Sequence, residues 1–173
     1  MRNEILEPFV RGLKVDGLHF QGMLFPGLMI TPEGPKVLEF NCRFGDPETQ
    51  VLMRRLKSDL LDLIEATIDG KLSEVHSIWE DRTAVCIVLA SGGYPGLIEK
   101  GKVISGLESV GTDPDVVVFQ GTALKEGKFV TNGGRVLGIT ALGSTLEEAR
   151  VKAYAVADQI SFEGKQFRHD IGA

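Results

Sequence analysis

Residues 36–50, KVLEFNCRFGDPETQ, decide the fold of the chain, because a strand pattern there runs into the start of a helix. Side chains point alternately to the two faces of a strand, so Glu39, Asn41 and Arg43 are predicted to share one face. Polar groups in a strand cost free energy unless they have partners or solvent, so this face calls for a separate explanation. The opposite face is predicted to be apolar and to account for folding, with Leu38, Phe40, Cys42 and Phe44.

The polar face offers a carboxylate at Glu39 and an amide oxygen at Asn41, about 7 Å apart along the strand. Mg2+ takes one or two such oxygen ligands and completes its octahedron with water and nucleotide phosphate oxygens. Arg43 beside them carries a guanidinium that holds a carboxylate or a phosphate through two hydrogen bonds. These residues alone leave a second interpretation open, which is an exposed hairpin face with ordinary surface side chains.

The turn that follows is predicted to begin a helix. Gly45 breaks the strand, Asp46 is a good N-cap, and Pro47 is a good first helical residue. The free N–H groups at such a helix start form an anion site unless Asp46 occupies them itself.

The chain around this stretch has the signals of a mixed fold. Helical spacing predicts an amphipathic helix first, followed by a strand interrupted by glycine and proline, a turn, and the strand described above. Two helices come next, the second with Ser58 as its cap and Gly70 at its end. These elements are predicted at residues 4–14, 18–31, 32–35, 36–44, 47–56 and 58–70.

From residue 83 onward the chain changes character, with short β-rich runs separated by glycines, which are typical of a small open sheet or half-barrel. The runs are TAVCIVLAS, KVISG, VVVFQGTAL, KFVTNGG and RVLGITALG. Ser144 or Thr145 is predicted to cap a final helix. Its inner stripe is Ala149, Ala153, Val156, Ala157 and Ile160. We therefore expect an α+β protein with two domains, residues 1–75 and 80–173, and a soft boundary between 71 and 81.

Composition limits the classes of function. The 173 residues suit one medium domain or two small ones, and 43% hydrophobic residues allow a real core. The net charge is −5 with scattered basic residues, which argues against a general nucleic-acid-binding surface. No apolar run reaches the length of a membrane span, and the N-terminal residues lack the apolar core of a signal peptide. We expect a soluble, cytoplasmic protein.

The longer string EFN-x-RFGDPETQ resembles the signature of the phosphoribosylamine–glycine ligases, also called glycinamide ribonucleotide synthetases, which are ATP-grasp enzymes of purine biosynthesis. Further segments resemble the same family in the same order. They are FVRGLKVDGLHFQGMLFPGLM, KSDLLDLIEATIDGKL, SGGYPG, TNGGRVLGITALG and the closing DIG. The resemblance covers essentially the whole chain. It implies the end of an ATP-grasp domain followed by a small β-rich C-terminal domain, a half-barrel or rudimentary hybrid motif with a terminal helix.

The resemblance also implies a reaction and a metal site. The family joins glycine to 5-phosphoribosylamine with ATP, through a glycyl phosphate, and forms glycinamide ribonucleotide, ADP and phosphate. By position, Glu39 and Asn41 are the ligands of the Mg2+ or Mn2+ ions that bridge the nucleotide phosphates. Arg43 is implied as a catalytic and substrate-binding residue that holds the glycine carboxylate or the acyl phosphate.

The remaining assignments leave alternatives open. Asp46 and Glu48 are candidates for direct substrate contact, but one is equally suited to cap the helix and the other to orient Arg43. Arg135 either binds the ribose phosphate of the acceptor or is a solvated arginine after a turn. Residues 92–96, GGYPG, either hold a phosphate with backbone N–H groups or form a tight loop.

The chain departs from the family in one respect, since the family enzyme is much longer. Its N-terminal domain, the glycine-rich loop and the adenine-binding residues have no counterpart here. We expect a C-terminal fragment that is inactive alone. One alternative is a non-catalytic module whose apolar residues, such as Phe9, Leu13 and Met23, dock to a complementing N-terminal chain or to a second copy. Another is a different ATP-grasp carboxylate–amine ligase, against which DPETQ and GGRVLGITALG argue.

Overall fold

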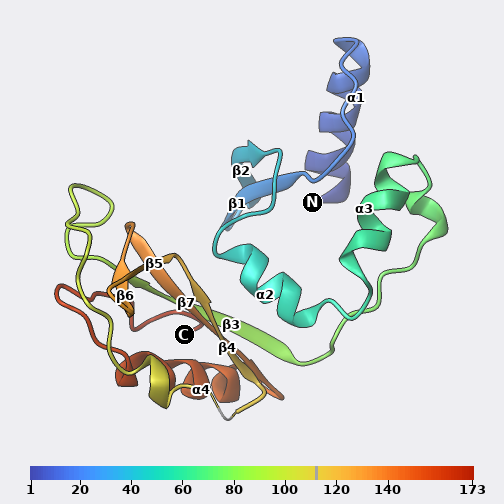
Figure 1. Cartoon of the computed structure of the whole chain (residues 1–173). Helices are drawn as coiled ribbons and strands as arrows, with labels where there is room; N and C mark the ends of the chain where they lie inside the picture. The colour runs from blue at the N-terminus through green and yellow to red at the C-terminus, as the bar shows by residue number, and fades with distance from the viewer. Residues whose placement is uncertain (112) are drawn as a thin grey trace. The chain divides into compact units, whose positions relative to one another are not determined.

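The computed structural model describes residues 1–111 and 113–173, and the chain forms two compact units (Figure 1). The first unit comprises Met1–Gly45 and Ser58–Ile78, and the second comprises Asp46–Lys57 and Trp79–Ala173. Both units combine helices with antiparallel strands, which confirms the predicted α+β class.

The first unit is a β-hairpin accompanied by short helices. Its elements are η1 (Arg2–Leu6, a π-helical turn), α1 (Glu7–Val15), β1 (Phe25–Thr31), β2 (Gly34–Asn41), α3 (Leu60–Ile68) and η2 (Leu72–Glu74). β1 and β2 pair antiparallel, from Phe25 opposite Asn41 to Thr31 opposite Gly34, with a register shift between Gly27 and Leu28.

Several boundaries in this unit differ from the sequence predictions. The strand expected at residues 18–31 begins only at Phe25, and its partner ends at Asn41 rather than at residue 44, because each strand is paired only as far as the other extends. Ser58 is not the cap of α3. The Asp59 carboxylate accepts from the backbone N–H of Leu61 at 2.8 Å, whereas the Ser58 hydroxyl accepts from the N–H of Ile78.

Apolar side chains of the first unit remain largely exposed. Among its described residues, Ile5 is the only buried hydrophobic side chain. The apolar face of β2, which is expected to account for folding, is not buried, since Leu38 is 65% exposed and Cys42 is also exposed. A two-stranded hairpin has too little area to bury a face by itself. Phe9 is partly covered by Phe40, with ring centroids 4.6 Å apart.

The second unit contains the core. Its elements are α2 (Glu48–Arg55), β3 (Thr83–Ala90), η3 (Leu107–Ser109), β4 (Val116–Gln120), β5 (Thr122–Lys125), β6 (Lys128–Thr131), β7 (Arg135–Gly143) and α4 (Leu146–Gln159). A three-stranded antiparallel sheet has the order β3-β7-β4, so β7 is central. Ile139 lies between Ile87 and Val118 in the register and is fully buried.

α4 covers one face of this sheet (Figure 1). Its small residues Ala149, Ala153 and Ala157 are fully buried and allow close contact with the strands, as the predicted inner stripe requires. The predicted cap is confirmed, since the Thr145 hydroxyl accepts from the N–H of Glu148 at 3.1 Å.

α2 packs against the other face of the sheet, on β3 and β7. The strand side chains that face α2 alternate along each strand with those that face α4. On this second face a Cβ at Gly138 would lie 3.3 Å from Cys86 Sγ, which is a tight contact, and 3.7 Å from Gln50 Cγ of α2, which is an ordinary one. The β5–β6 hairpin is separate from the main sheet. The run KVISG forms isolated bridges at Val103 and Ser105 in place of the predicted strand.

Candidate functional site

The two predicted metal ligands lie together on the first unit. Glu39 and Asn41 are on the same face of β2, and the Asn41 amide donates a hydrogen bond to Glu39 Oε1 at 2.8 Å. Glu39 is exposed and Asn41 is half-buried. The pair presents a carboxylate and an amide oxygen, which are hard ligands of the kind that Mg2+ and Mn2+ take. The described residues contain no cluster of three or more His, Cys, Asp or Glu side chains suited to a metal, so these two oxygens would need water or phosphate as further ligands.

Arg43 is not on the strand, contrary to the prediction. β2 ends at Asn41, and Arg43 lies in the bend beyond it with an exposed side chain. Its Nη1 donates to the backbone carbonyl of Phe44 at 3.0 Å. The physical reason is that β1 has no paired residue beyond Phe25, so nothing extends the ladder to residue 43.

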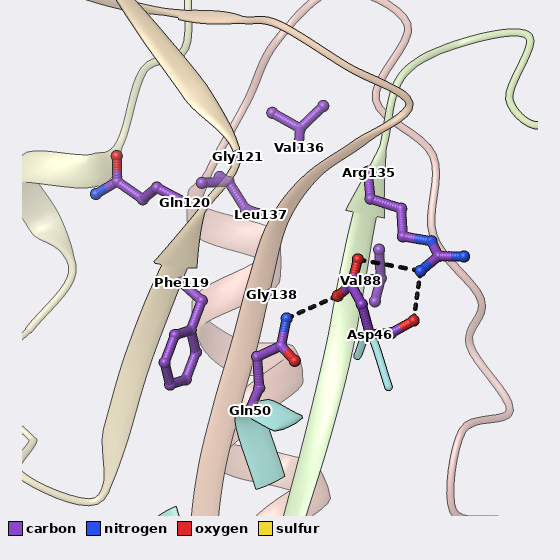
Figure 2. A pocket seen from close by; sticks show the side chains of 10 residues that line it. All are labelled: Asp46, Gln50, Val88, Phe119, Gln120, Gly121, Arg135, Val136, Leu137 and Gly138. Atoms are coloured by element: carbon purple, nitrogen blue, oxygen red, sulfur yellow. Dashed lines mark hydrogen bonds and ion pairs between the residues drawn. The ribbon is translucent and has the colours of Figure 1, made fainter. Parts of the chain in front are cut away.

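A second group of predicted residues lines a pocket in the second unit (Figure 2). The pocket has a volume of about 250 Å³, which is slightly below the range of roughly 300–1,000 Å³ of most small-molecule sites. The residues that line it are Asp46, Gln50, Val88, Phe119, Gln120, Gly121, Arg135, Val136, Leu137 and Gly138. Asp46 and Arg135, which are far apart in the sequence, point toward one another across one end of it (Figure 2).

Arg135 begins β7 and makes three polar contacts through two of its nitrogens. Nη1 lies 3.1 Å from Asp46 Oδ2 and also donates to the backbone carbonyl of Asp46. Nε donates to the Tyr94 hydroxyl at 2.8 Å. The Tyr94 hydroxyl first, and then the Asp46 carboxylate, raise the pKa of Arg135, so the guanidinium is a permanent cation. Among residues 1–111 and 113–173, no protein acceptor takes a hydrogen bond from Nη2.

Asp46 is not the N-cap that the sequence predicts. α2 begins at Glu48, and within residues 1–111 and 113–173 no side chain caps it. The Asp46 carboxylate is occupied elsewhere, since Oδ2 faces Arg135 and Oδ1 accepts from the Gln50 amide at 2.8 Å. The long-range partner Arg135 therefore decides where this side chain points (Figure 2).

Glu48 lies half-buried in the first turn of α2. Burial is the main cause that raises the pKa of Cys86, and the charges of Asp46 and Glu48 raise it further. Cys86 is therefore a protonated, unreactive thiol at neutral pH.

Two residues of the site were missed by sequence reasoning. Gln50 sits one turn after Asp46 and holds its carboxylate, and only the i, i+4 spacing pointed to that contact. Tyr94 lies in the GGYPG loop, which the sequence predicts to be a phosphate cradle or a tight loop. Its hydroxyl accepts from Arg135 and its ring lies beneath the guanidinium, with Cζ 5.8 Å from the ring centroid.

Comparisons with known proteins place this chain in a family. Residues 1–49 match the sequence model of the ATP-grasp (A) domain of phosphoribosylglycinamide synthetase, and residues 84–173 match that of its C domain. The chain therefore combines part of an ATP-grasp domain with the domain that follows it in this class of protein. It belongs to the phosphoribosylglycinamide synthetase family, which confirms the resemblance drawn from the sequence.

Individual relatives of the chain support the same family. The chain is 53% identical over 173 residues to a phosphoribosylamine–glycine ligase of Caldanaerobacter subterraneus, covering 100% of this chain and 41% of that protein. It is 52% identical to the Vibrio vulnificus enzyme, covering 98% of this chain and 40% of that protein. A crystal structure of the Thermotoga maritima phosphoribosylamine–glycine ligase is 39% identical with a TM-score of 0.75, covering 98% of this chain and 41% of that chain.

A long-chain acyl-CoA carboxylase shares the fold alone, at 16% identity and a TM-score of 0.56, covering 85% of this chain and 17% of that chain. The chain spans about two fifths of the length of the ligases it matches. Helices in the described ranges are all too short or too polar to cross a bilayer.

Proposed function

We propose that this chain supplies the metal-ligand strand and the acceptor-binding pocket of a phosphoribosylamine–glycine ligase. The complete reaction joins glycine to 5-phosphoribosylamine and converts ATP to ADP and phosphate. The observation that carries the proposal is the Arg135 pocket, in which a fixed guanidinium keeps one amino group, Nη2, without a protein acceptor in the described ranges.

Arg135 binds the phosphate of 5-phosphoribosylamine through that amino group. A guanidinium is well matched to phosphate because its donors lie in one plane and its charge is permanent. Asp46 holds the guanidinium from the opposite side and shares the pocket with the substrate. Glu48, in the first turn of α2, does not line this pocket, and its contact with the substrate is proposed from the family resemblance alone.

Glu39 and Asn41 bind Mg2+ or Mn2+ in the assembled enzyme, because their oxygens match the donor chemistry of these ions and share one face of β2. A bound divalent ion offsets negative charge on the phosphates of ATP. Arg43, exposed just after the strand, binds the carboxylate of glycine or its acyl phosphate.

Isothermal titration with ribose 5-phosphate tests the acceptor pocket, because this compound keeps the phosphate and lacks the unstable amine. We expect the chain to bind it and Arg135→Ala to lose the binding. Arg168→Ala is the matched control, because it removes the same charge from the C-terminal segment, where Arg168 pairs with Asp170. Binding by Arg135→Ala that equals that of the unchanged chain contradicts the proposal.

The chain is proposed to be inactive by itself. It spans 41% of its Caldanaerobacter relative, and its match to the ATP-grasp model is limited to residues 1–49. An assay with ATP, glycine and phosphoribosylamine tests this, and product formation at a rate typical of such ligases rejects it.

A second candidate function is docking to a complementing chain. It rests on the exposed apolar side chains of the β1–β2 hairpin, among them Met29 at 53%, Ile30 at 76% and Leu38 at 65% exposure. Such a surface favours association with the remainder of an ATP-grasp domain or with a second copy. Light scattering tests it, since a strict monomer at high concentration that also fails to bind the remainder of the domain has no docking face.

A further inference from the structure

We propose that Tyr94 is a positioning residue that fixes the guanidinium of Arg135 and leaves Nη2 available to the ligand. This inference rests on the proposed function, because it concerns how the same pocket holds a phosphate. Tyr94 does not touch the ligand in this account. Its effect is exerted through Arg135.

The hydrogen bonds of Arg135 occupy some of its N–H donors and leave others for a ligand. A guanidinium has five N–H donors. Nε donates to the Tyr94 hydroxyl at 2.8 Å, and Nη1 donates to Asp46 Oδ2 and to the Asp46 backbone carbonyl. In the described part of the chain these contacts leave the two N–H groups of Nη2 for a ligand.

The Tyr94 ring is itself held in place by contact with Gly134. A Cβ built on Gly134 would lie 2.1 Å from Cδ2 and 2.7 Å from Cε2 of Tyr94, so the ring rests directly on the backbone just before Arg135. The neighbouring Gly133 differs, because a Cβ there would have its nearest neighbour, the Arg135 carbonyl, 3.8 Å away. The ring therefore needs glycine at residue 134 but not at residue 133.

The loop that carries Tyr94 is tied to the same turn. The buried residue Ser91 donates from its N–H to the Gly134 carbonyl and from its hydroxyl to the Gly133 carbonyl, both at 2.8 Å. The Gln166 amide donates to the carbonyls of Ser91 and Tyr94 at 3.1 and 3.0 Å. These bonds make residues 91–96 a rigid support, which explains the GGYPG motif without a direct phosphate contact.

Arg135 needs such a support because its side chain is 42% exposed. A long exposed side chain loses rotamer entropy when it binds a ligand, and contacts that fix it beforehand lower this cost. Removing the Tyr94 hydroxyl deletes one hydrogen bond to a charged group. We expect this to weaken ribose 5-phosphate binding about 3- to 10-fold.

Two variants with a matched control test the inference in the full chain. Tyr94→Phe keeps the ring and removes only the hydroxyl. Gly134→Ala keeps the hydroxyl and displaces the ring, while Gly133→Ala adds the same methyl group without a clash. We measure ribose 5-phosphate affinity by titration and the NMR signal of the Arg135 Nε–H, with circular dichroism to confirm folding.

We expect Tyr94→Phe and Gly134→Ala to weaken binding and to shift the Nε–H signal, and Gly133→Ala to do neither. Should Gly134→Ala fail to fold, Tyr94→Phe decides alone. Unchanged affinity in Tyr94→Phe, with binding lost in Arg135→Ala, overturns this inference and leaves the proposed function standing. Unchanged affinity in Arg135→Ala overturns both.

Discussion

Two isoleucine-to-alanine changes, one in each unit, should differ sharply in cost. Ile139 is fully buried on the central strand of the second unit, whereas Ile30 on β1 of the first unit is 76% exposed. Each change removes the same atoms. At about 0.8 kcal/mol per buried methylene, the transfer loss at Ile139 is about 2.4 kcal/mol, and the cavity brings the total to about 3–4 kcal/mol. Ile30→Ala should cost less than about 1 kcal/mol, including lost strand propensity.

Urea unfolding followed by NMR measures each cost on the unit that carries the change, since cross-peaks from the two units are read separately. The refuting results are distinct. A loss below about 1 kcal/mol for Ile139→Ala contradicts the assignment of the core to the second unit. A loss above about 2 kcal/mol for Ile30→Ala shows that its side chain is covered in solution, against the exposed face that the docking hypothesis uses.

Two further predictions concern contacts that hold the second unit together. Lys152 and then Arg82 hold the pKa of Asp115 below its usual range, so its stabilising effect is present at neutral pH and is lost as the pH falls through that lowered value. In urea unfolding, Asp115→Asn should therefore have a lower free energy of unfolding than the unchanged chain at pH 7. This difference in free energy should shrink below about pH 4. A difference that grows in acid contradicts the prediction. Thr145→Ala removes the cap of α4 and should cost about 1 kcal/mol in thermal or urea unfolding, whereas Ser144→Ala leaves the cap in place.

Local signals in the sequence were sufficient for α4. Thr145 is followed by Glu148 and by alanines at residues 149, 153 and 157, and both the cap and the buried stripe are present in the structure. A cap and a stripe lie within one element, so sequence spacing determines them. The shared face of Glu39 and Asn41 was predictable for the same reason, since alternation is a property of a single strand.

Contacts between residues far apart in the sequence explain most of the differences between the sequence predictions and the structure. Asp46 has the sequence context of an N-cap, but its carboxylate is held by Arg135, 89 positions later. Arg43 continues the alternating pattern, but the length of β2 is set by its pairing with β1, which begins at Phe25. The role of Tyr94 depends on contact with Gly134, which no local pattern in GGYPG encodes.

The sequence likewise predicts the pocket only in part. Asp46 and Arg135 are each predicted to contact the substrate, but nothing in the sequence indicates that they face one another. The metal-ligand roles of Glu39 and Asn41 and the substrate roles of Arg43, Asp46, Glu48 and Arg135 stay predictions.

Reconstitution of ligase activity tests the central claim most directly. The chain is mixed with a second polypeptide that carries the remaining part of the Caldanaerobacter ligase, and glycinamide ribonucleotide is measured after addition of ATP, Mg2+, glycine and phosphoribosylamine. We predict no product from either polypeptide alone, product from the mixture, and loss of product when the chain carries Glu39→Ala or Arg135→Ala. Product from the chain alone, or a mixture in which both variants are as active as the unchanged chain, would contradict the account.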